Sequence, residues 1–477
     1  MNKQSVMMQY FEWYLPDTPH LWKIIQQDAM HLSHIGIDAL WLPPAFKGIG
    51  GVHDVGYGVY DLYDLGEFDQ KGTVRTKYGT KDDYLKAIET LHTYHIQVYG
   101  DIVLNHKMGA DRNQLVKAYE VSQKDKNEKI GEEKLIEVST LFTFDNRHQK
   151  YSDFIWDWTC FKGIDYDVMS KRHATFLFKD KQWDQHVDSE FGNFDYLMGA
   201  DIDFSQQKVL DELEKWGKWY LDITHIDGMR LDAIKHIDAY FYKDWLLKMR
   251  KYKNEDFFVV GEYWHGNVKK LLDYLQKVQF SMSLFDVPLH YHFYEIAYAN
   301  GQYDLSKIFQ GTLVEAMPHC AVTFVDNHDT QPSQGLQSWI PDWFKPLAYA
   351  LILLRQDGYP CVFYGDYYGI QKKPSAISHQ LDILLMLRKK YIFKDQMDYL
   401  DDKNVIGWTQ KNSFACIMSD LIDGSKKMYI GKEYAGCIMK DILKNCQEDI
   451  VIDDEGFGIF LVKGGYVSVY VKKEDMD

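Results

Sequence analysis

The stretch IDGMRLDAIKH, residues 226–236, shows the pattern on which the fold prediction depends. An apolar run ends in charged side chains, as a buried strand does where it reaches the rim of a sheet. Seven other short runs of apolar or β-branched residues occur along the chain. The eight predicted strands cover residues 6–11, 37–42, 96–104, 226–231, 257–261, 280–285, 321–325 and 360–364.

Most of these predicted strands are separated by segments with helical periodicity. In residues 21–34 apolar side chains recur at helical spacing, and Gly36 suits the end of that helix. A second helical segment, residues 82–94, follows Thr80, which is a favourable N-cap residue. When strands alternate with helices along the chain, the strands usually pair in parallel. Closing the sheet into a barrel then leaves no exposed edge strand. The sequence therefore predicts an α/β fold built on a (β/α)8 barrel, or TIM barrel.

Two stretches interrupt this alternation. Residues 105–225 separate the third and fourth strands, which is far more than an ordinary loop, so we expect an inserted β-rich subdomain. Beyond residue 399 the helical pattern gives way to short β-type runs with turn residues between them, which indicate a small antiparallel β domain. The predicted division is a catalytic barrel of residues 1–104 and 206–397, an inserted metal-binding subdomain of residues 105–205, and a C-terminal β domain of residues 398–477.

Composition narrows the classes of function. The chain has 477 residues and a mass of 56.1 kDa, and 46% of its residues are hydrophobic, so it can bury a sizeable core. Its formal charge of −16 repels nucleic-acid phosphates and anionic lipids, so we expect neither nucleic acid nor a membrane as a partner. The 34 Tyr, 26 Phe and 13 Trp residues suit a ligand with apolar ring faces, such as a sugar, unless they only fill the core.

The sequence also indicates a cellular location. The chain runs into MQYFEWY (8–14) without the apolar segment of a signal peptide, and no apolar run is long enough to cross a bilayer. The six cysteines form no CxxC motif and no dense framework, which is typical of reduced thiols inside a cell. We therefore expect a cytoplasmic protein, and we expect it to be a monomer.

Acidic side chains stand just after the ends of several predicted strands. Asp232, Glu262 and Asp329 follow the fourth, fifth and seventh strands, whose ends meet at one rim of a barrel. Cleavage of a glycosidic bond needs two carboxyl groups, one charged and one protonated. Arg230, two residues before Asp232, faces the same side and keeps that carboxylate ionised, whereas aromatic neighbours would raise the pKa of Glu262. Each acid alone is explained better as a capping or salt-bridged residue, and only their joint occurrence favours a catalytic site.

Four strings containing these residues resemble, in order, the four short motifs of the α-amylase family of retaining glycoside hydrolases, glycoside hydrolase family 13. The strings are DIVLNH (101–106), GMRLDAIKH (228–236), GEYW (261–264) and FVDNHD (324–329). The resemblance covers almost the whole chain and is strongest to bacterial liquefying-type α-amylases, because MQYFEWY and WLPPAFKG (41–48) match as well. It implies an endo-acting hydrolase of α-1,4-glucosidic bonds in starch, glycogen or maltodextrins, working by double displacement through a covalent glycosyl-enzyme intermediate.

The resemblance also implies a role for each motif residue. Asp232 is the nucleophile, Glu262 is the general acid/base, and Asp329 is a third acid that stabilises the transition state. Arg230 positions Asp232, and the remaining residues bind the substrate. These residues are His106, His328 and Tyr57 at the cleaved glucose unit, and Lys235, His236 and Trp264 on the leaving-group side, with Asp101 in support.

Carboxylates are concentrated in DYLMGADID (195–203), and a hard cation that prefers oxygen ligands, such as calcium, suits them. An EF-hand beginning at Asp201 is excluded because Gln206 stands where that loop requires glycine. A solvated acidic loop is the alternative. The resemblance implies one structural Ca²⁺ between the insertion and the barrel. Its predicted ligands are Asn105, Asp195, Asp201 and the backbone carbonyl of His236.

Some liquefying relatives carry a linear calcium–sodium–calcium cluster, and this sequence departs from it. Asp184 is retained, but Lys162 and Ser205 replace two acidic positions, and a lysine ammonium can substitute for a cation. We therefore expect no additional calcium or sodium ions. We also expect no chloride, because residues 330–332 (TQP) lack the arginine of chloride-dependent relatives.

Other functions are weaker alternatives. A nucleotide-sugar glycosyltransferase could use Asp201 and Asp203 as a metal-binding DxD motif, but the sequence has no nucleotide-binding βαβ start and no GxxxxGK motif. A catalytically silent carbohydrate-binding protein would not need all three acids. A transglycosylase or an oligosaccharide-specific hydrolase of the same family stays open, because loops rather than motifs determine the product.

Overall fold

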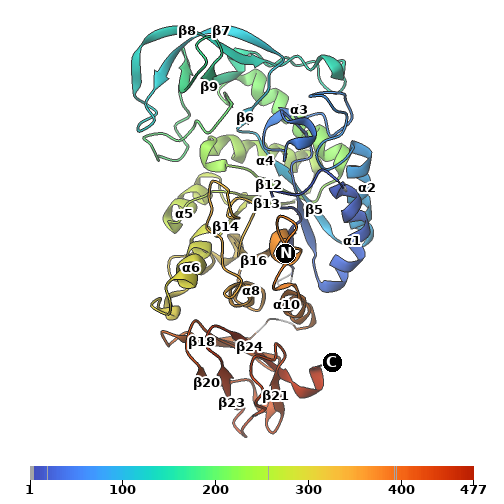
Figure 1. The fold of residues 1–477 in the computed structure, drawn as a ribbon, viewed down its shortest axis with the longest axis vertical. Helices are drawn as coiled ribbons and strands as arrows, with labels where there is room; N and C mark the ends of the chain where they lie inside the picture. The colour runs from blue at the N-terminus through green and yellow to red at the C-terminus, as the bar shows by residue number, and fades with distance from the viewer. Residues whose placement is uncertain (1–4, 19, 256, 392, 394, 477) are drawn as a thin grey trace.

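The computed structural model describes residues 5–18, 20–255, 257–391, 393 and 395–476. Its centre is a closed barrel of eight parallel strands, in the order β1-β16-β15-β14-β13-β12-β5-β2 (Figure 1). The barrel strands are β1 (Met7–Gln9), β2 (Ala39–Leu42), β5 (Gln97–Ile102), β12 (Gly228–Leu231), β13 (Phe258–Gly261), β14 (Ser283–Phe285), β15 (Ala321–Phe324) and β16 (Tyr359–Phe363). Each overlaps one predicted strand, so the predicted (β/α)8 fold is confirmed. Residues 1–4, on which the signal-peptide prediction partly rests, lie outside the described residues.

Helices surround the barrel, and local sequence signals mark the end of the first helix and the beginning of the second. Helix α1 (Leu21–Ile35) ends at Gly36, whose φ of 97° lies in the left-handed region that favours glycine. Helix α2 (Lys81–Thr93) begins with a capping box, in which the Thr80 hydroxyl accepts a hydrogen bond from the backbone N–H of Asp83. The other helices are α3 (Gln207–Thr224), α4 (Ala239–Lys253), α5 (Val268–Lys277), α6 (Val287–Tyr298), α7 (Leu313–Ala316), α8 (Lys345–Leu353), α9 (Tyr364–Tyr367) and α10 (Ser378–Lys390).

Between β5 and β12 the chain leaves the barrel and forms an antiparallel sheet at one end of the molecule (Figure 1). Its strands, in spatial order, are β6 (His106–Lys107), β11 (Ala200–Ile202), β9 (Phe161–Asp167), β10 (Arg172–Phe178), β7 (Arg112–Val121) and β8 (Lys129–Leu141). Two short strands after β2, β3 (Lys47–Gly48) and β4 (Val59–Asp61), pair with each other. Strand β6 follows β5 after only three residues, so the inserted sheet begins at the rim of the barrel.

The C-terminal part of the chain is antiparallel β structure at the opposite end of the molecule (Figure 1), as predicted. Its strands are β17 (Gln396–Tyr399), β18 (Val405–Gln410), β19 (Phe414–Ser419), β20 (Gly424–Tyr429), β21 (Ile438–Asp441), β22 (Ile450–Val451), β23 (Phe457–Val462) and β24 (Val467–Lys472). It is joined to the barrel through Arg355, which makes two hydrogen bonds of 2.7 and 2.8 Å to Asp398. The indole N–H of Trp408 also donates to the carbonyl of Leu354 at 3.0 Å. The C-terminal domain is therefore packed against the barrel by polar contacts as well as apolar ones.

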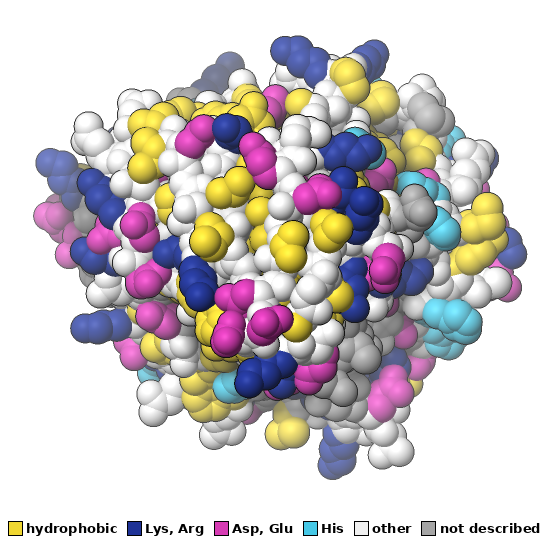
Figure 2. Space-filling model, turned by 90° about the horizontal axis from the view of Figure 1, so that it is seen from below, with side chains coloured by type: hydrophobic (Ala, Val, Ile, Leu, Met, Phe, Trp, Pro, Cys, Tyr) yellow, Lys and Arg dark blue, Asp and Glu magenta, His cyan; other side chains and the backbone are white. Residues whose placement is uncertain are grey.

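Charges of both signs are mixed on this end of the molecule. In Figure 2, Lys and Arg side chains alternate with Asp and Glu side chains. Four ion pairs on the C-terminal domain contribute to this pattern: Lys426 with Asp401, Lys427 with Asp453, Lys440 with Asp449, and Lys463 with Asp423. Such an interspersed surface lacks the single-sign field that steers nucleic acid or anionic lipid.

Two features of the sequence can be compared with the structure directly. All six cysteines carry free thiols, and five of them are buried. No helix in the described part of the chain combines the length and the apolar character that a bilayer span requires.

Candidate active site

The register of the barrel brings two of the predicted acids together. Strand β12 pairs in parallel with β13, and Leu231 lies opposite Gly261. The next residues along these strands are Asp232 and Glu262, so both acids follow the C-terminal ends of neighbouring strands. The backbone holds this alignment, because the N–H of Glu262 donates to the carbonyl of Leu231 at 2.9 Å.

A single arginine joins three carboxylates beneath the rim. The Arg230 side chain is fully buried, and its Nη1 lies 2.7 Å from Oδ1 of Asp232 and 2.8 Å from Oδ1 of Asp101. Its Nη2 donates a short hydrogen bond to Oε2 of Glu262. The sequence predicted the contact with Asp232, but not those with Asp101 and Glu262. Because a guanidinium stays charged in proteins, Arg230 is a permanent cation that positions all three carboxylates.

Burial and like charges control the proton on Glu262. Burial and the nearby carboxylates of Asp232 and Asp329 together outweigh the opposing charge of Arg230 and raise the pKa of Glu262 to about 8. Burial likewise raises the pKa of Asp329 to about 7. Glu262 therefore carries a proton near neutral pH, which is the state that its predicted role requires. The shift comes first from desolvation, which is the mechanism by which the predicted aromatic neighbours would act, and then from repulsion between carboxylates.

The loop after β15 positions Asp329 and the histidine before it. The side-chain oxygen of Asn327 accepts the backbone N–H groups of Asp329 and Thr330 at 2.9 Å each, which holds the loop in a turn. Nδ1 of His328 lies 3.0 Å from the Gln9 side-chain amide, and Nε2 lies 3.3 Å from Oδ2 of Asp329. Burial lowers the pKa of His328 well below its ordinary value, so the ring is neutral. With Gln9 donating to Nδ1, the ring proton is on Nε2, facing Asp329.

These side chains face a cavity of about 510 Å³. Nine of the ten residues predicted as catalytic or substrate-binding line it, namely Tyr57, His106, Asp232, Lys235, His236, Glu262, Trp264, His328 and Asp329. The tenth, Arg230, is buried and does not line it. Lining residues that the sequence did not predict are Trp13, Glu190, Phe194, Leu197, Met198, Ala233, Gly335 and Leu336. Trp13 belongs to the quoted MQYFEWY string and Ala233 to GMRLDAIKH, which were therefore available signals, whereas the others belong to no motif that the sequence analysis assigned to the cavity.

Parallel rings form part of the wall of this cavity. The rings of Trp13, Tyr57 and His328 have interplanar angles of 3°, 5° and 6° and centroid distances between 5.1 and 6.0 Å. The Tyr57 hydroxyl donates to Asp101 at 2.8 Å, and Nε2 of His106 lies 2.8 Å from the carbonyl oxygen of Tyr57. Flat ring faces beside polar atoms suit a pyranose, which has apolar faces and hydroxyl edges.

Residues of the inserted subdomain contact Lys235 and His236 on the barrel side of the site. Nζ of Lys235 lies 3.0 Å from Oε2 of Glu190 and donates to the carbonyl of Trp264 at 3.2 Å. Nδ1 of His236 lies 2.7 Å from the carbonyl oxygen of Phe194. These contacts attach the segment around residue 190 to the barrel loop after β12, so the cavity is formed by both parts of the chain.

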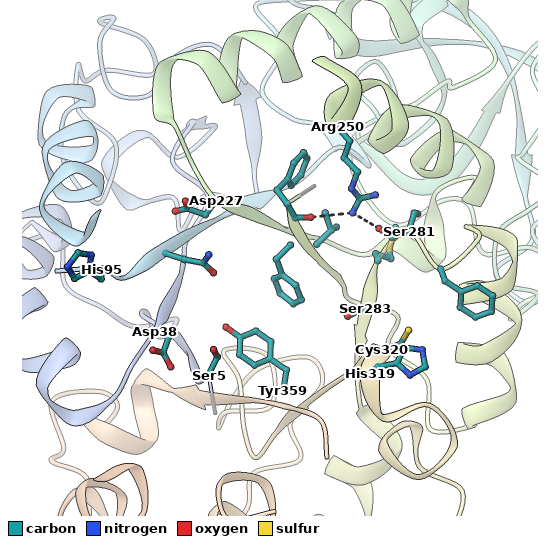
Figure 3. A pocket seen from close by; sticks show the side chains of 16 residues that line it. Ser5, Asp38, His95, Asp227, Arg250, Ser281, Ser283, His319, Cys320 and Tyr359 are labelled. Atoms are coloured by element: carbon teal, nitrogen blue, oxygen red, sulfur yellow. Dashed lines mark hydrogen bonds between the residues drawn. The ribbon is translucent and has the colours of Figure 1, made fainter. Parts of the chain in front are cut away.

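A larger cavity, of about 770 Å³, lies at the opposite end of the barrel (Figure 3). Residues at the beginnings of the strands line it, among them Asp38, Asp227 and Tyr359. Its carboxylates bind backbone groups, because Asp38 accepts the N–H of Val6 at 3.0 Å and Asp227 accepts that of Val98 at 2.8 Å. Side chains at this end of a barrel serve stability, whereas reactive groups occupy the C-terminal rim. Cavity size alone does not identify the active site.

The predicted calcium ligands lie where the insertion meets the barrel. Asp201 of β11 pairs with His106 of β6, the residue after Asn105. Three buried oxygens of this group have no hydrogen-bond partner: Oδ1 of Asn105, Oδ1 of Asp195 and Oδ2 of Asp201. Burying such oxygens is costly unless a cation binds them. No cluster of three or more His, Cys, Asp or Glu side chains in the described chain is arranged as a metal site. The predicted ligand set would not form such a cluster, because it has only two carboxylates and completes its oxygens with an amide and a backbone carbonyl. Calcium prefers oxygen ligands of these kinds, so the unpartnered oxygens fit it.

Lys162 occupies the acidic cluster beside these oxygens. Its ammonium lies 2.5 Å from Oδ2 of Asp184, 2.8 Å from Oδ2 of Asp195 and 4.0 Å from Oδ2 of Asp201. Burial alone would lower the pKa of Lys162, but the surrounding carboxylates outweigh it and raise the pKa. The two carboxylate oxygens of Asp195 have different surroundings. Oδ2 contacts the Lys162 ammonium, and Oδ1 has no hydrogen-bond partner. A fixed positive charge therefore lies next to the candidate calcium ligands.

Known proteins resemble this chain in sequence and fold. Residues 22–414 match the family model described as alpha amylase, catalytic domain. The chain is 49% identical to an alpha-amylase of Geobacillus stearothermophilus, over 98% of this chain and 87% of that relative. It is 47% identical to an alpha-amylase of Bacillus licheniformis (99% and 94% covered), and 42% identical to the cytoplasmic alpha-amylase of Escherichia coli strain K12 (99% of each).

A solved structure shows the same fold at lower identity. The alpha-amylase from Geobacillus thermoleovorans in complex with acarbose superposes with a TM-score of 0.64, covers 100% of both chains and is 16% identical in sequence. The family model spans most of the chain, and the three relatives above are each more than 40% identical over nearly its whole length. The chain therefore belongs to the α-amylase family of glycoside hydrolases, whose members hydrolyse α-glucans.

Proposed function

We propose that this enzyme cleaves internal α-1,4-glucosidic bonds of starch, glycogen or maltodextrins with retention of anomeric configuration. The observation that carries the proposal is the guanidinium of Arg230, which contacts Asp232 and Glu262 at the same time. Neighbouring strands lie about 4.8 Å apart, and retaining glycosidases hold their two carboxyl groups about 5–5.5 Å apart. Adjacent acids on paired strands thus support retention over inversion, which needs a wider gap.

In the proposed first step, a carboxylate oxygen of Asp232 attacks the anomeric carbon while the bond to the leaving oxygen breaks. Glu262 gives its proton to that oxygen, which departs as a hydroxyl group, and the glucosyl unit becomes an ester of Asp232. In the second step the ionised Glu262 takes a proton from water, and the water oxygen attacks the same carbon and releases Asp232. Each step inverts the carbon, so the product keeps the configuration of the substrate.

The neighbouring residues have supporting roles in this proposal. The Nε2–H of His328 and the carboxyl of Asp329 bind hydroxyl groups of the cleaved glucose unit and stabilise positive charge at the anomeric carbon. Tyr57 stacks on the same glucose ring, and His106 binds one of its hydroxyls. Lys235, His236 and Trp264 contact the departing part of the chain. The guanidinium of Arg230 keeps Asp232 aligned and negatively charged.

The stereochemistry of the first product tests this mechanism. In ¹H NMR spectra recorded during rapid hydrolysis of maltoheptaose, we expect the α-anomer of the new reducing end to appear before mutarotation produces the β-anomer. Initial appearance of the β-anomer would show inversion and exclude the covalent intermediate. Cleavage of an oligosaccharide blocked at its non-reducing end tests whether attack is internal, because an exo-acting enzyme leaves this substrate intact.

The raised pKa of Glu262 predicts the alkaline limit of activity. We expect kcat/KM for maltoheptaose to fall above an apparent pKa near 8, because Glu262 is protonated below that pH and loses its proton above it. Asp329→Asn removes one negative charge that raises this pKa, so its residual activity should decline from a lower pH. The measurement is a pH profile of kcat/KM for both proteins. An alkaline limb at the same pH in both would contradict the assignment.

We further propose that one Ca²⁺ is held by Asn105, Asp195, Asp201 and the carbonyl of His236. The unpartnered buried oxygens of the first three support this proposal. When bound, the ion would neutralise these carboxylates and connect the insertion to the barrel. The ammonium of Lys162 and the replacement of an acid by Ser205 argue against the further calcium and sodium ions of some relatives.

Removal of calcium is expected to lower thermal stability. Chelation leaves buried oxygens without a partner, so Tm measured by circular dichroism should fall in EDTA and recover when Ca²⁺ is added. Elemental analysis of the dialysed protein should give one calcium per chain. An unchanged Tm together with no bound calcium would contradict the proposed site, and two or more ions would contradict the role given to Lys162.

We also propose that the enzyme works in the cytoplasm as a monomer, on imported maltodextrin or stored glycogen. Similarity to a relative named cytoplasmic and the presence of six free thiols support this location. We keep the proposed division of the chain into a barrel (1–104 and 206–397), an insertion (105–205) and a β domain (398–477). The first strand of the β domain, β17, begins at Gln396, two residues before the last boundary. Cell fractionation and light scattering test location and assembly.

A further inference from the structure

A buried lysine connects the ends of two barrel strands and does not line the active-site cavity. Lys345 is the first residue of α8, the helix between β15 and β16, and it is 1% exposed. Its ammonium lies 2.8 Å from Oδ2 of Asp326, two residues beyond β15. It also donates a short hydrogen bond to Oδ1 of Asp366, three residues beyond β16. These three residues are called the lysine cluster below.

The lysine cluster is buried and charged. The side chains of Asp326 and Asp366 are 0% and 1% exposed. The Tyr349 hydroxyl donates to Oδ2 of Asp366 at 2.6 Å, and the ammonium lies 3.2 Å from the ring centroid of Trp339. Burial alone would lower the pKa of Lys345, but the two carboxylates outweigh it and raise the pKa. A fixed positive charge therefore lies between two acids.

The position of Lys345 is unfavourable for the helix itself. The N-terminus of a helix carries partial positive charge, so a cation at its first residue is destabilising. Burying an ammonium is costly as well, and an ion pair in a core is often no more stabilising than well-packed apolar side chains. The lysine is therefore better explained by the two carboxylates that it holds than by the stability of α8.

One of these carboxylates supports the loop that carries Asp329. The Thr330 hydroxyl donates to Oδ1 of Asp326 at 2.8 Å and accepts the backbone N–H of Asn327 at 3.0 Å. The side-chain oxygen of Asn327 in turn accepts the N–H of Asp329. A continuous series of contacts thus leads from the ammonium of Lys345 through Asp326 and Thr330 to the backbone of Asp329.

We propose that Lys345 is a positioning residue for the cleavage reaction, which holds the carboxyl of Asp329 in place through the loop of residues 326–330. The proposal rests on the proposed function, in which Asp329 stabilises the transition state. A displacement of about 1 Å at a reacting centre can lower a rate about 100-fold, even when the changed residue is remote. Because Lys345 does not line the cavity, its loss should affect the rate of cleavage more than the binding of substrate.

Replacing Lys345 with methionine tests the proposal. Steady-state kinetics on maltoheptaose should show kcat about 100-fold lower and KM within about twofold of the parent value, because Asp329 loses its alignment. The matched control is Arg355→Met, which removes an ion pair with Asp398 just beyond the other end of α8. This control should lower Tm but keep kcat within about twofold. Equal losses of kcat in both variants would show general damage around α8 and overturn the proposal.

A double-mutant cycle distinguishes positioning from a purely structural role. Asp329→Asn removes the group that Lys345 is proposed to hold in place. In that background Lys345→Met should lower kcat by less than about tenfold further, because the two substitutions affect the same interaction. If Lys345→Met again lowers kcat about 100-fold, the lysine acts independently of Asp329 and the proposal is wrong.

Thr330→Val gives a second test that does not depend on how Lys345→Met folds. Valine keeps nearly the same shape but lacks the hydroxyl that joins Asp326 to the loop, so kcat should fall about tenfold at nearly constant KM. A parental kcat for this variant would overturn the proposal. Failure of the proposed function gives a different pattern, because then the parent enzyme would not cleave maltoheptaose, or Asp329→Asn would keep the parental kcat.

Discussion

Replacing Asp232 with asparagine is expected to lower kcat on maltoheptaose by about 10⁵-fold, since removal of a nucleophile abolishes the covalent step and leaves only binding and electrostatic effects. An amide is nearly the same size as the carboxylate, and its oxygen still accepts a hydrogen bond from Arg230, so the fold should be kept. Steady-state release of reducing sugar measures the loss. An unchanged KM would show that the substrate still binds.

Chemical rescue separates loss of the nucleophile from general damage. Asp232→Gly opens space beside the anomeric carbon, so added azide should attack from the side of the missing carboxylate and give a β-glucosyl azide. The parent enzyme should form no such product. If Asp232→Asn keeps more than a few per cent of the parent kcat after contaminating enzyme is excluded, or if azide gives only the α-product with Asp232→Gly, Asp232 is not the nucleophile.

Replacing Lys162 with methionine is expected to destabilise the protein by about 3–5 kcal/mol, the effect of removing one partner from a buried ion pair. The ammonium lies among Asp184, Asp195 and Asp201, and methionine fills similar volume without any charge. The three carboxylates would then repel one another in a buried site. Thermal and urea unfolding of the parent and variant, both saturated with calcium, measure the change.

Two further variants make this prediction specific. Lys463→Met removes a solvent-exposed partner of Asp423 and should change stability by less than about 0.5 kcal/mol. Lys162→Asp places a fourth carboxylate in the cluster, so its Tm should be lower than that of Lys162→Met in chelator and should rise more when calcium is added. A Lys162→Met variant as stable as the parent would show that the ammonium does not neutralise the cluster.

The barrel was predictable from the sequence because each of its strands is marked by a pattern among neighbouring residues. Each barrel strand is a short apolar run, and buried parallel strands require this along their whole length. The chemistry was predictable for a related reason. The acids directly follow these runs, and the closing of a barrel brings the ends of all its strands to one rim, however far apart they lie in the chain. Asp232 and Glu262 could therefore be placed near each other before any distance was known.

Contacts between residues of distant segments were harder to predict from the sequence. Arg230 was expected to serve Asp232 two residues away, but the pairing of β12 with β5 and β13 adds Asp101 and Glu262 to the same guanidinium. Likewise, part of the raised pKa of Glu262 comes from the carboxylates of Asp232 and Asp329, which follow other strands. Such effects depend on strand register, which the chain acquires only when it folds.

The sequence by itself therefore determined the eight-stranded barrel, the positions of the insertion and the β domain in chain order, and the residue types at the catalytic rim. Tertiary structure alone decided how Trp13 stacks beside Tyr57 and His328, and how Lys162 lies among three carboxylates. The physical reason is the range of the interactions. Apolar periodicity and capping act between near neighbours in the chain, whereas stacking, charge neutralisation and desolvation act through space between segments that only the folded chain brings together.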